Sequence, residues 1–112
     1  MSRSIDVSPL QIEIGEQELW FRFTDPDSIM LEIPPAFEGQ LRQIAEENRE
    51  QFEGKTVHLE LENLTAISSR QLGMILTLRE VMKPFGQLQL HNTSESVKRL
   101  LQLTGTDRFF DV

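Results

Sequence analysis

Apolar and polar residues alternate with a period of two in four segments of the chain, at 19–23, 28–33, 56–62 and 87–91. In the third segment, Val57, Leu59 and Leu61 are separated by His58 and Glu60. Successive side chains of a strand point to opposite faces, so this pattern predicts strands that are buried on one face only. A fifth, short segment at 12–14 is predicted to add an edge strand.

Three other segments repeat apolar residues every three or four positions, which is typical of amphipathic helices. The first lies between Pro35 and Gly54, where the apolar stripe consists of Phe37, Leu41, Ile44, Ala45 and Phe52. The second runs from about residue 69 to 85 and carries Leu72, Ile75, Leu76 and Met82. The third runs from about residue 94 to 103, and Gly105 follows it as an expected C-cap.

The predicted order of elements is strand, strand, helix, strand, helix, strand, helix, which implies parallel strands joined by crossover helices. A sheet covered on both faces would have continuously apolar strands, whereas these strands alternate. We therefore predict one α/β domain over 1–112, a two-layer sandwich with a mixed, mostly parallel sheet of four or five strands and helices on one face. The opposite face would carry Trp20, Arg22, Met30, Glu32, His58, Glu60, Gln89 and His91.

Charge and composition narrow the class of partner. The chain has eleven Lys and Arg against eighteen Asp and Glu, a net charge of −7. Phosphate backbones and anionic membrane surfaces would repel such a chain, and its basic residues do not cluster in the sequence. We expect a protein partner, no nucleic acid and no membrane insertion, and leave open a homo-oligomer. With no long apolar run, no signal-peptide pattern at the N-terminus and no cysteine, the expected location is the cytoplasm.

Known catalytic motifs give no match. The sequence contains no HExxH, no P-loop, no GxGxxG and no GxSxG elbow around Ser69. His58, His91 and Glu60 could be drawn as a metal site, but polar residues on an open sheet face are the expected explanation. We therefore predict a protein that is not an enzyme and has no metal or cofactor of its own.

The segment TAISSRQLGMIL, at 65–76, places two serines where a strand gives way to a helix. The strand ends near Asn63, and the helix begins near Ser69. Ser68 is then a typical N-cap, which stabilises a helix by about 1 kcal/mol. Ser69 would lie in the first turn, where the helix N-terminus favours a phosphate and where Arg70 is close by.

From about Lys55 to the end, the chain resembles a STAS domain, the family of bacterial anti-sigma factor antagonists. The family loop reads Asp-Ser-Ser/Thr-Gly-Leu-Gly after a Thr-x-Ile approach. Thr65 and Ile67 match the approach, Ser69 matches the first serine, and Leu72 and Gly73 match the Leu-Gly. The ending LLQLTGTDRFFDV is similar to the last helix and tail of the family.

The loop also departs from the family pattern. Ser68 stands where the family has Asp, Arg70 replaces the second small hydroxyl residue, and Gln71 replaces glycine. Upstream, LEIPPAF occupies the place of the Gly-x-Leu/Ile-Asp that precedes the first long helix of the family.

The resemblance implies a regulatory module that takes part in transcription control and signal transduction by binding a partner kinase that doubles as an anti-sigma factor. In the family, the serine that matches Ser69 is phosphorylated by this partner, which would supply the ATP and magnesium. Residues Thr65, Ser68, Ser69, Arg70, Gln71 and Gly73 would form or shape the partner-binding surface. The alternative, favoured by the departures, is a STAS-like scaffold subunit of a signalling or transporter complex, without phosphorylation.

Overall fold

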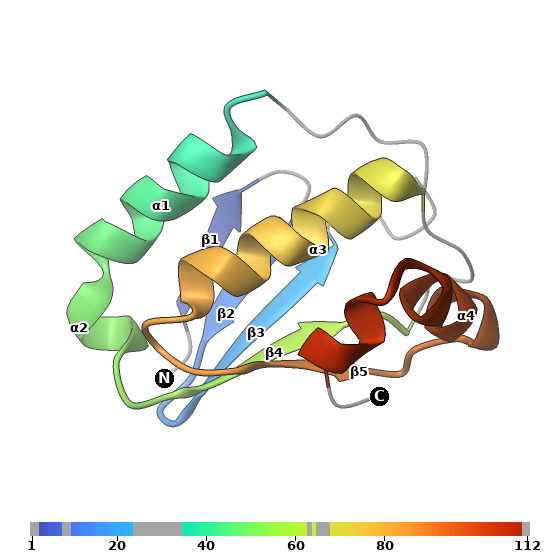
Figure 1. Cartoon of the computed structure of the whole chain (residues 1–112). Coiled ribbons are helices and arrows are strands. Elements are labelled where there is room, and N and C mark those ends of the chain that lie inside the picture. Colours follow the sequence, from blue (N-terminus) through green and yellow to red (C-terminus); the bar gives the residue numbers. More distant parts are fainter. Residues whose placement is uncertain (1–2, 8–9, 24–34, 63, 65–67, 111–112) are drawn as a thin grey trace.

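The computed structural model describes residues 3–7, 10–23, 35–62, 64 and 68–110 (Figure 1). Its N-terminal part is an antiparallel meander of β1 (Arg3–Val7), β2 (Leu10–Ile14) and β3 (Glu18–Phe23). In β2, three buried apolar residues alternate with half-buried Gln11 and Glu13. The turn into β3 is closed by the Gly15 N–H, which donates to the Glu18 carbonyl oxygen at 2.9 Å.

The second half of the sheet is parallel. β4 (Thr56–Glu60) pairs with β3, and β5 (Leu88–His91) pairs with β4, which gives the strand order β1-β2-β3-β4-β5. Trp20, His58 and Gln89 lie in one row across the three strands. The strand predicted at 28–33, with Met30 and Glu32, lies outside the described residues.

Two crossovers carry helices. α1 (Phe37–Glu47) and the short α2 (Arg49–Phe52) join β3 to β4, and α3 (Ser69–Met82) joins β4 to β5. α4 (Glu95–Thr104) follows β5, with Ser94 as its N-cap, because the Ser94 Oγ accepts the Val97 N–H at 3.2 Å. Gly105 ends α4 with a φ of 75°, which confirms the expected C-cap, and a 3₁₀ turn η1 (Thr106–Phe109) completes the described chain.

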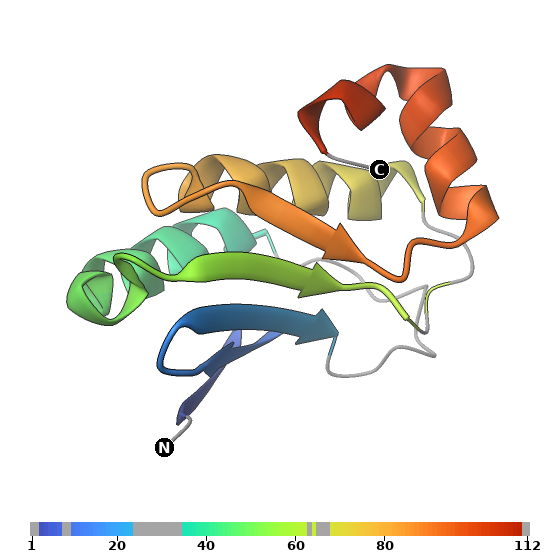
Figure 2. The ribbon, with the colours of Figure 1, turned by 90° about the horizontal axis from the view of Figure 1, so that it is seen from below.

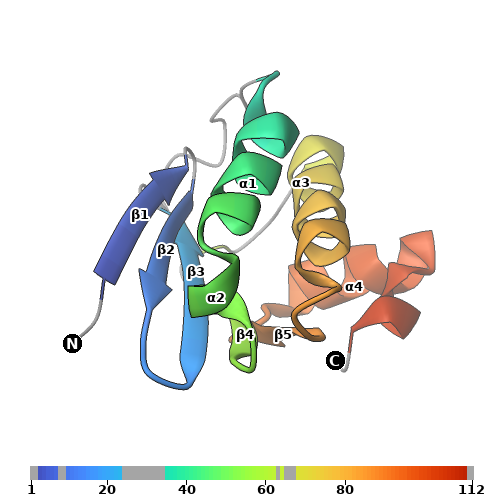
Figure 3. The same cartoon turned by 90° about the vertical axis from the view of Figure 1, so that its left-hand side faces the viewer.

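The helices and the sheet form two layers. α1 and α3 pack side by side over one face of the sheet, and α4 with η1 lies on the far side of α3, beyond β5 (Figures 1 and 3). The view from below shows the opposite face of the sheet in front of these helices (Figure 2). One hydrophobic core lies between the layers, and its largest fully buried side chains include Phe21, Phe52, Leu59, Leu78 and Met82.

Two details of the predicted sheet are wrong. Over the described strands, the sheet is mixed but not mostly parallel, because two strand pairings are antiparallel and two are parallel. Segment 12–14 is not an edge strand, because β1 covers its outer side. The cause of both errors is β1, where only Ile5 and Val7 are apolar and three of five residues are exposed. An edge strand buries too little to produce a strong alternation.

Candidate functional site

The N-terminus of α3 is closed by a reciprocal pair of hydrogen bonds between Ser68 and Gln71. The Ser68 Oγ accepts the Gln71 backbone N–H at 3.3 Å, and the Gln71 Oε1 accepts the Ser68 backbone N–H at 2.5 Å. This arrangement is a capping box, which satisfies two backbone donors that the helix itself cannot pair. The predicted role of Ser68 as N-cap is therefore confirmed.

Ser69 is the first residue of α3 and is exposed, as is Arg70 after it. Because Ser68 supplies the cap, the Ser69 hydroxyl is not needed to close the helix. The helix follows β4 and so begins at the carboxyl end of a parallel strand, where open α/β sheets place their binding sites. A negatively charged group on Ser69 would meet the partial positive charge of the α3 N-terminus.

The remaining candidate residues divide into exposed and buried positions. Gly73, one helical turn after Ser69, is exposed, and a Cβ added there would have no neighbour within 4 Å. Gln71 is only 6% exposed, so it contributes to the N-terminus of α3 as a buried side chain and not as part of the surface. The exposed residues in the first two turns of α3 are thus Ser69, Arg70 and Gly73, which we call the α3 strip. Thr65 lies outside the described residues.

A second polar cluster lies on the face of the sheet away from α1 and α3. The His58 Nδ1 is 2.7 Å from the His91 Nε2, and the Trp20 ring stacks on the His58 ring with centroids 4.3 Å apart. His58 is 6% exposed although the strand pattern predicted an open face. Stacking between neighbouring strands buries it, and a pattern of single strands does not reveal such contacts.

Burial lowers the pKa of His58 from its ordinary value of 6.5, and the adjacent His91 lowers this pKa further. Glu18 acts in the opposite direction, since its Oε1 lies 3.5 Å from the His58 Nε2. Because that distance exceeds the usual hydrogen-bond range, the contact between Glu18 and His58 is an electrostatic one. The lowered pKa favours the neutral imidazole of His58 near pH 7.

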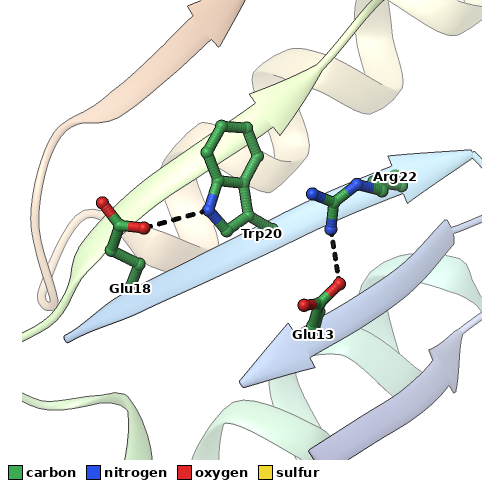
Figure 4. A network of polar contacts seen from close by, with 4 residues as sticks. All are labelled: Glu13, Glu18, Trp20 and Arg22. Carbon is green, nitrogen blue, oxygen red and sulfur yellow. Dashed lines mark hydrogen bonds and ion pairs between the residues drawn. The ribbon is translucent and has the colours of Figure 1, made fainter. Parts of the chain in front are cut away.

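Three further contacts stabilise this face at β2 and β3, and Figure 4 marks the two polar ones. The Arg22 guanidinium binds the Glu13 carboxylate at 2.7 Å and lies 5.0 Å from the Trp20 ring centroid. The Trp20 Nε1–H donates to the Glu18 Oε2 at 3.3 Å. The Trp20 side chain therefore contacts the charged side chains of Arg22 and Glu18 while its ring stacks on His58.

Among the described residues, no group of three His, Asp or Glu side chains is arranged to hold a metal ion. Glu60, which was weighed with the histidines, accepts hydrogen bonds from the Asn92 amide at 2.9 and 3.1 Å.

The sequence matches no protein-family model and no curated protein with which it was compared. Within the described part of the chain, no helix combines the length and the apolar character needed to cross a membrane.

Proposed function

We propose that this chain is a regulatory protein-binding module of the STAS type that docks on a partner anti-sigma factor kinase through the α3 strip. The observation that carries the proposal is the position of Ser69. It is exposed at the start of α3, while its neighbour Ser68 closes the helix. A hydroxyl that the fold does not use is accessible where a kinase would need it.

Phosphorylation of Ser69 would act as a switch on this surface. A phosphate adds about −1.5 to −2 charges, and the helix N-terminus and Arg70 would stabilise it without unfolding α3. The same charge would disrupt a partner surface packed closely over the α3 strip. Exposed Gly73 leaves room for such close packing, because it has no side chain.

The arrangement of the chain supports this reading. In this two-layer α/β fold, α3 follows the parallel strand β4. That arrangement agrees with the fold that the resemblance implies. The net charge of −7 favours a protein partner over a nucleic acid. The phosphate, ATP and magnesium would all come from the partner, so the chain itself needs no catalytic group.

The test compares Ser69→Asp and Ser69→Ala in chains purified with their partners from the native cells. We expect Ser69→Asp to lose the partner and Ser69→Ala to retain it. Ser96→Asp is the matched control, because Ser96 is an exposed serine in the first turn of α4. Phosphopeptide mapping of the wild-type chain, in growth and under stress, should show a phosphate on Ser69. Equal partner recovery with both Ser69 variants would contradict the switch.

A specific observation favours the second function, a scaffold subunit without phosphorylation. The two residues that replace the Asp and Gly of the family loop, Ser68 and Gln71, bond to each other in the capping box. The departures therefore serve the stability of α3. A stoichiometric partner that is recovered equally with Ser69→Asp and Ser69→Ala would support the scaffold.

A further inference from the structure

Among the described strands, β5 is the last of the sheet on this side, and its outer side carries backbone groups that β4 does not use. The Leu61 N–H donates to the His91 carbonyl oxygen at 3.0 Å, so His91 directs its backbone groups toward β4. Backbone groups alternate in direction along a strand, and Gln89 therefore also faces β4. Leu88, which precedes Gln89, and Leu90, which follows it, direct their N–H and C=O groups to the outer edge of β5.

A groove follows this edge. It has a volume of about 530 Å³ and is lined by Gln87, by all four residues of β5, and by Arg108 and Phe110. The groove therefore spans the whole of β5 and ends at the segment that follows α4. A cavity of this size, which runs along backbone donors and acceptors, suits an extended peptide rather than a helix.

The charges around the groove favour an acidic occupant. Among the described residues, its lining contains the cation Arg108 and no carboxylate. The Arg108 Nε donates to the Gly105 carbonyl oxygen at 2.8 Å, and its guanidinium carbon lies 5.8 Å from the Phe109 ring centroid. None of the ion pairs found among the described residues uses Arg108. Its guanidinium is thus held in place without an ion pair to any described carboxylate, in a chain whose net charge is −7.

We propose that an extended, acidic segment of a partner protein binds along β5 and adds a strand to the sheet. Its backbone pairs with the outward groups of Leu88 and Leu90, and a carboxylate of the segment pairs with Arg108. This surface is separate from the α3 strip, so the module offers two independent docking sites.

The first test uses amide hydrogen exchange in the free chain. The N–H groups of Leu88 and Leu90 should exchange much faster than those of Gln89 and His91, because only the latter pair with β4. Protection of Leu88 and Leu90 that is independent of protein concentration would show that the edge is already covered, which would overturn the proposal. Protection that rises with protein concentration, together with dimers in light scattering, would overturn it in favour of a second copy.

The second test titrates the labelled chain with the hexapeptide Glu-Val-Glu-Val-Glu-Val and with its Lys-Val counterpart. The acidic peptide should shift and protect the amides of Leu88 and Leu90, and the basic peptide should bind more weakly. Arg108→Glu should weaken binding of the acidic peptide about fivefold. Arg99→Glu is the control, because Arg99 is exposed on α4 and does not line the groove.

Two results would refute the proposal. One is the absence of any shift along β5 at millimolar acidic peptide. The other is an equal loss of affinity in Arg108→Glu and Arg99→Glu, which would mean that net charge alone attracts the peptide. Neither result depends on Ser69, so this site can fail while the proposed switch stands.

Discussion

Ser68 and Ser69 are neighbours in the sequence but have different surroundings. Ser68 bonds to the first turn of α3, where a cap of this kind contributes about 1 kcal/mol. Ser69 is exposed, and the helix forms without its hydroxyl. Because the cap and the exposed hydroxyl belong to different residues, the proposed phosphorylation of Ser69 would leave the cap of the helix intact.

The buried histidine makes the stability of the fold depend on pH. The pKa of His58 is lower in the folded chain than its ordinary value of 6.5, so the folded state favours the neutral ring. The unfolded state therefore binds more protons than the folded state as the pH falls below 6.5. The free energy of unfolding should be highest above that pH and should decrease as the pH falls through the folded pKa.

Urea unfolding between about pH 5 and 8 measures this dependence. The variant His58→Gln removes the titrating group, and its stability should change less over this range than that of the wild type. His91→Gln retains His58 but removes one cause of its lowered pKa, so its stability should depend on pH less than that of the wild type. If His58→Gln and the wild type gave parallel curves, the titration of His58 would not be the cause.

At the scale of single residues, the sequence predicts those features that depend only on nearby residues in the chain. Ser68 is a good N-cap wherever a helix follows it, so its role could be predicted. The capping partner Gln71 was interpreted as a departure from a loop pattern, although a Ser-x-x-Gln spacing is itself a capping-box signal. The stacking of Trp20 on His58 depends on which strands are neighbours, and single-strand patterns do not contain that information.

At the scale of elements, two glycines serve opposite purposes. Gly105 has a φ of 75°, which an L residue rarely adopts, whereas Gly73 lies inside α3 with open space around it. We expect Gly105→Ala to lower the free energy of unfolding by about 1 kcal/mol and Gly73→Ala to raise it by about 0.5–1 kcal/mol. Urea unfolding of the two variants checks both signs, and destabilisation by Gly73→Ala would contradict the geometry.

The Gly73→Ala variant also tests whether a partner docks on the α3 strip. A methyl group on the α3 strip would keep a closely packed partner away without damage to the fold. Loss of the partner by a variant of higher stability would therefore locate the contact at this helix.

The predicted helices correspond to α1, α3 and α4, with shifts at their ends. Their apolar stripes are long and face the core, which makes the periodicity strong. β3, β4 and β5 also follow their predicted segments. The strand β1 was missed, because a solvent-exposed edge leaves only a weak pattern. That omission also produced the wrong prediction of a mostly parallel sheet.

At the scale of the molecule, one core connects the four α-helices and the five strands that the structure describes. The radius of gyration of the Cα atoms is 13.3 Å, close to the value of about 13 Å for a compact domain of this length. We expect a single cooperative unfolding transition. The fluorescence of Trp20, on the open face, and the far-ultraviolet circular dichroism of the helices should give the same midpoint in urea. An earlier fluorescence midpoint would show that the open face unfolds separately.

The antiparallel meander precedes the helices along the chain, and this order has a consequence during protein synthesis. β1, β2 and β3 pair through short turns, so they can form as soon as they leave the ribosome. Their inner face, with Leu10, Ile12, Leu19 and Phe21, is covered only when α1 and α3 have been made. The outer side of β3 likewise stays unpaired until β4 arrives. The nascent chain therefore passes through an interval in which an apolar sheet with an open edge can aggregate, and we expect chaperones to act on it then.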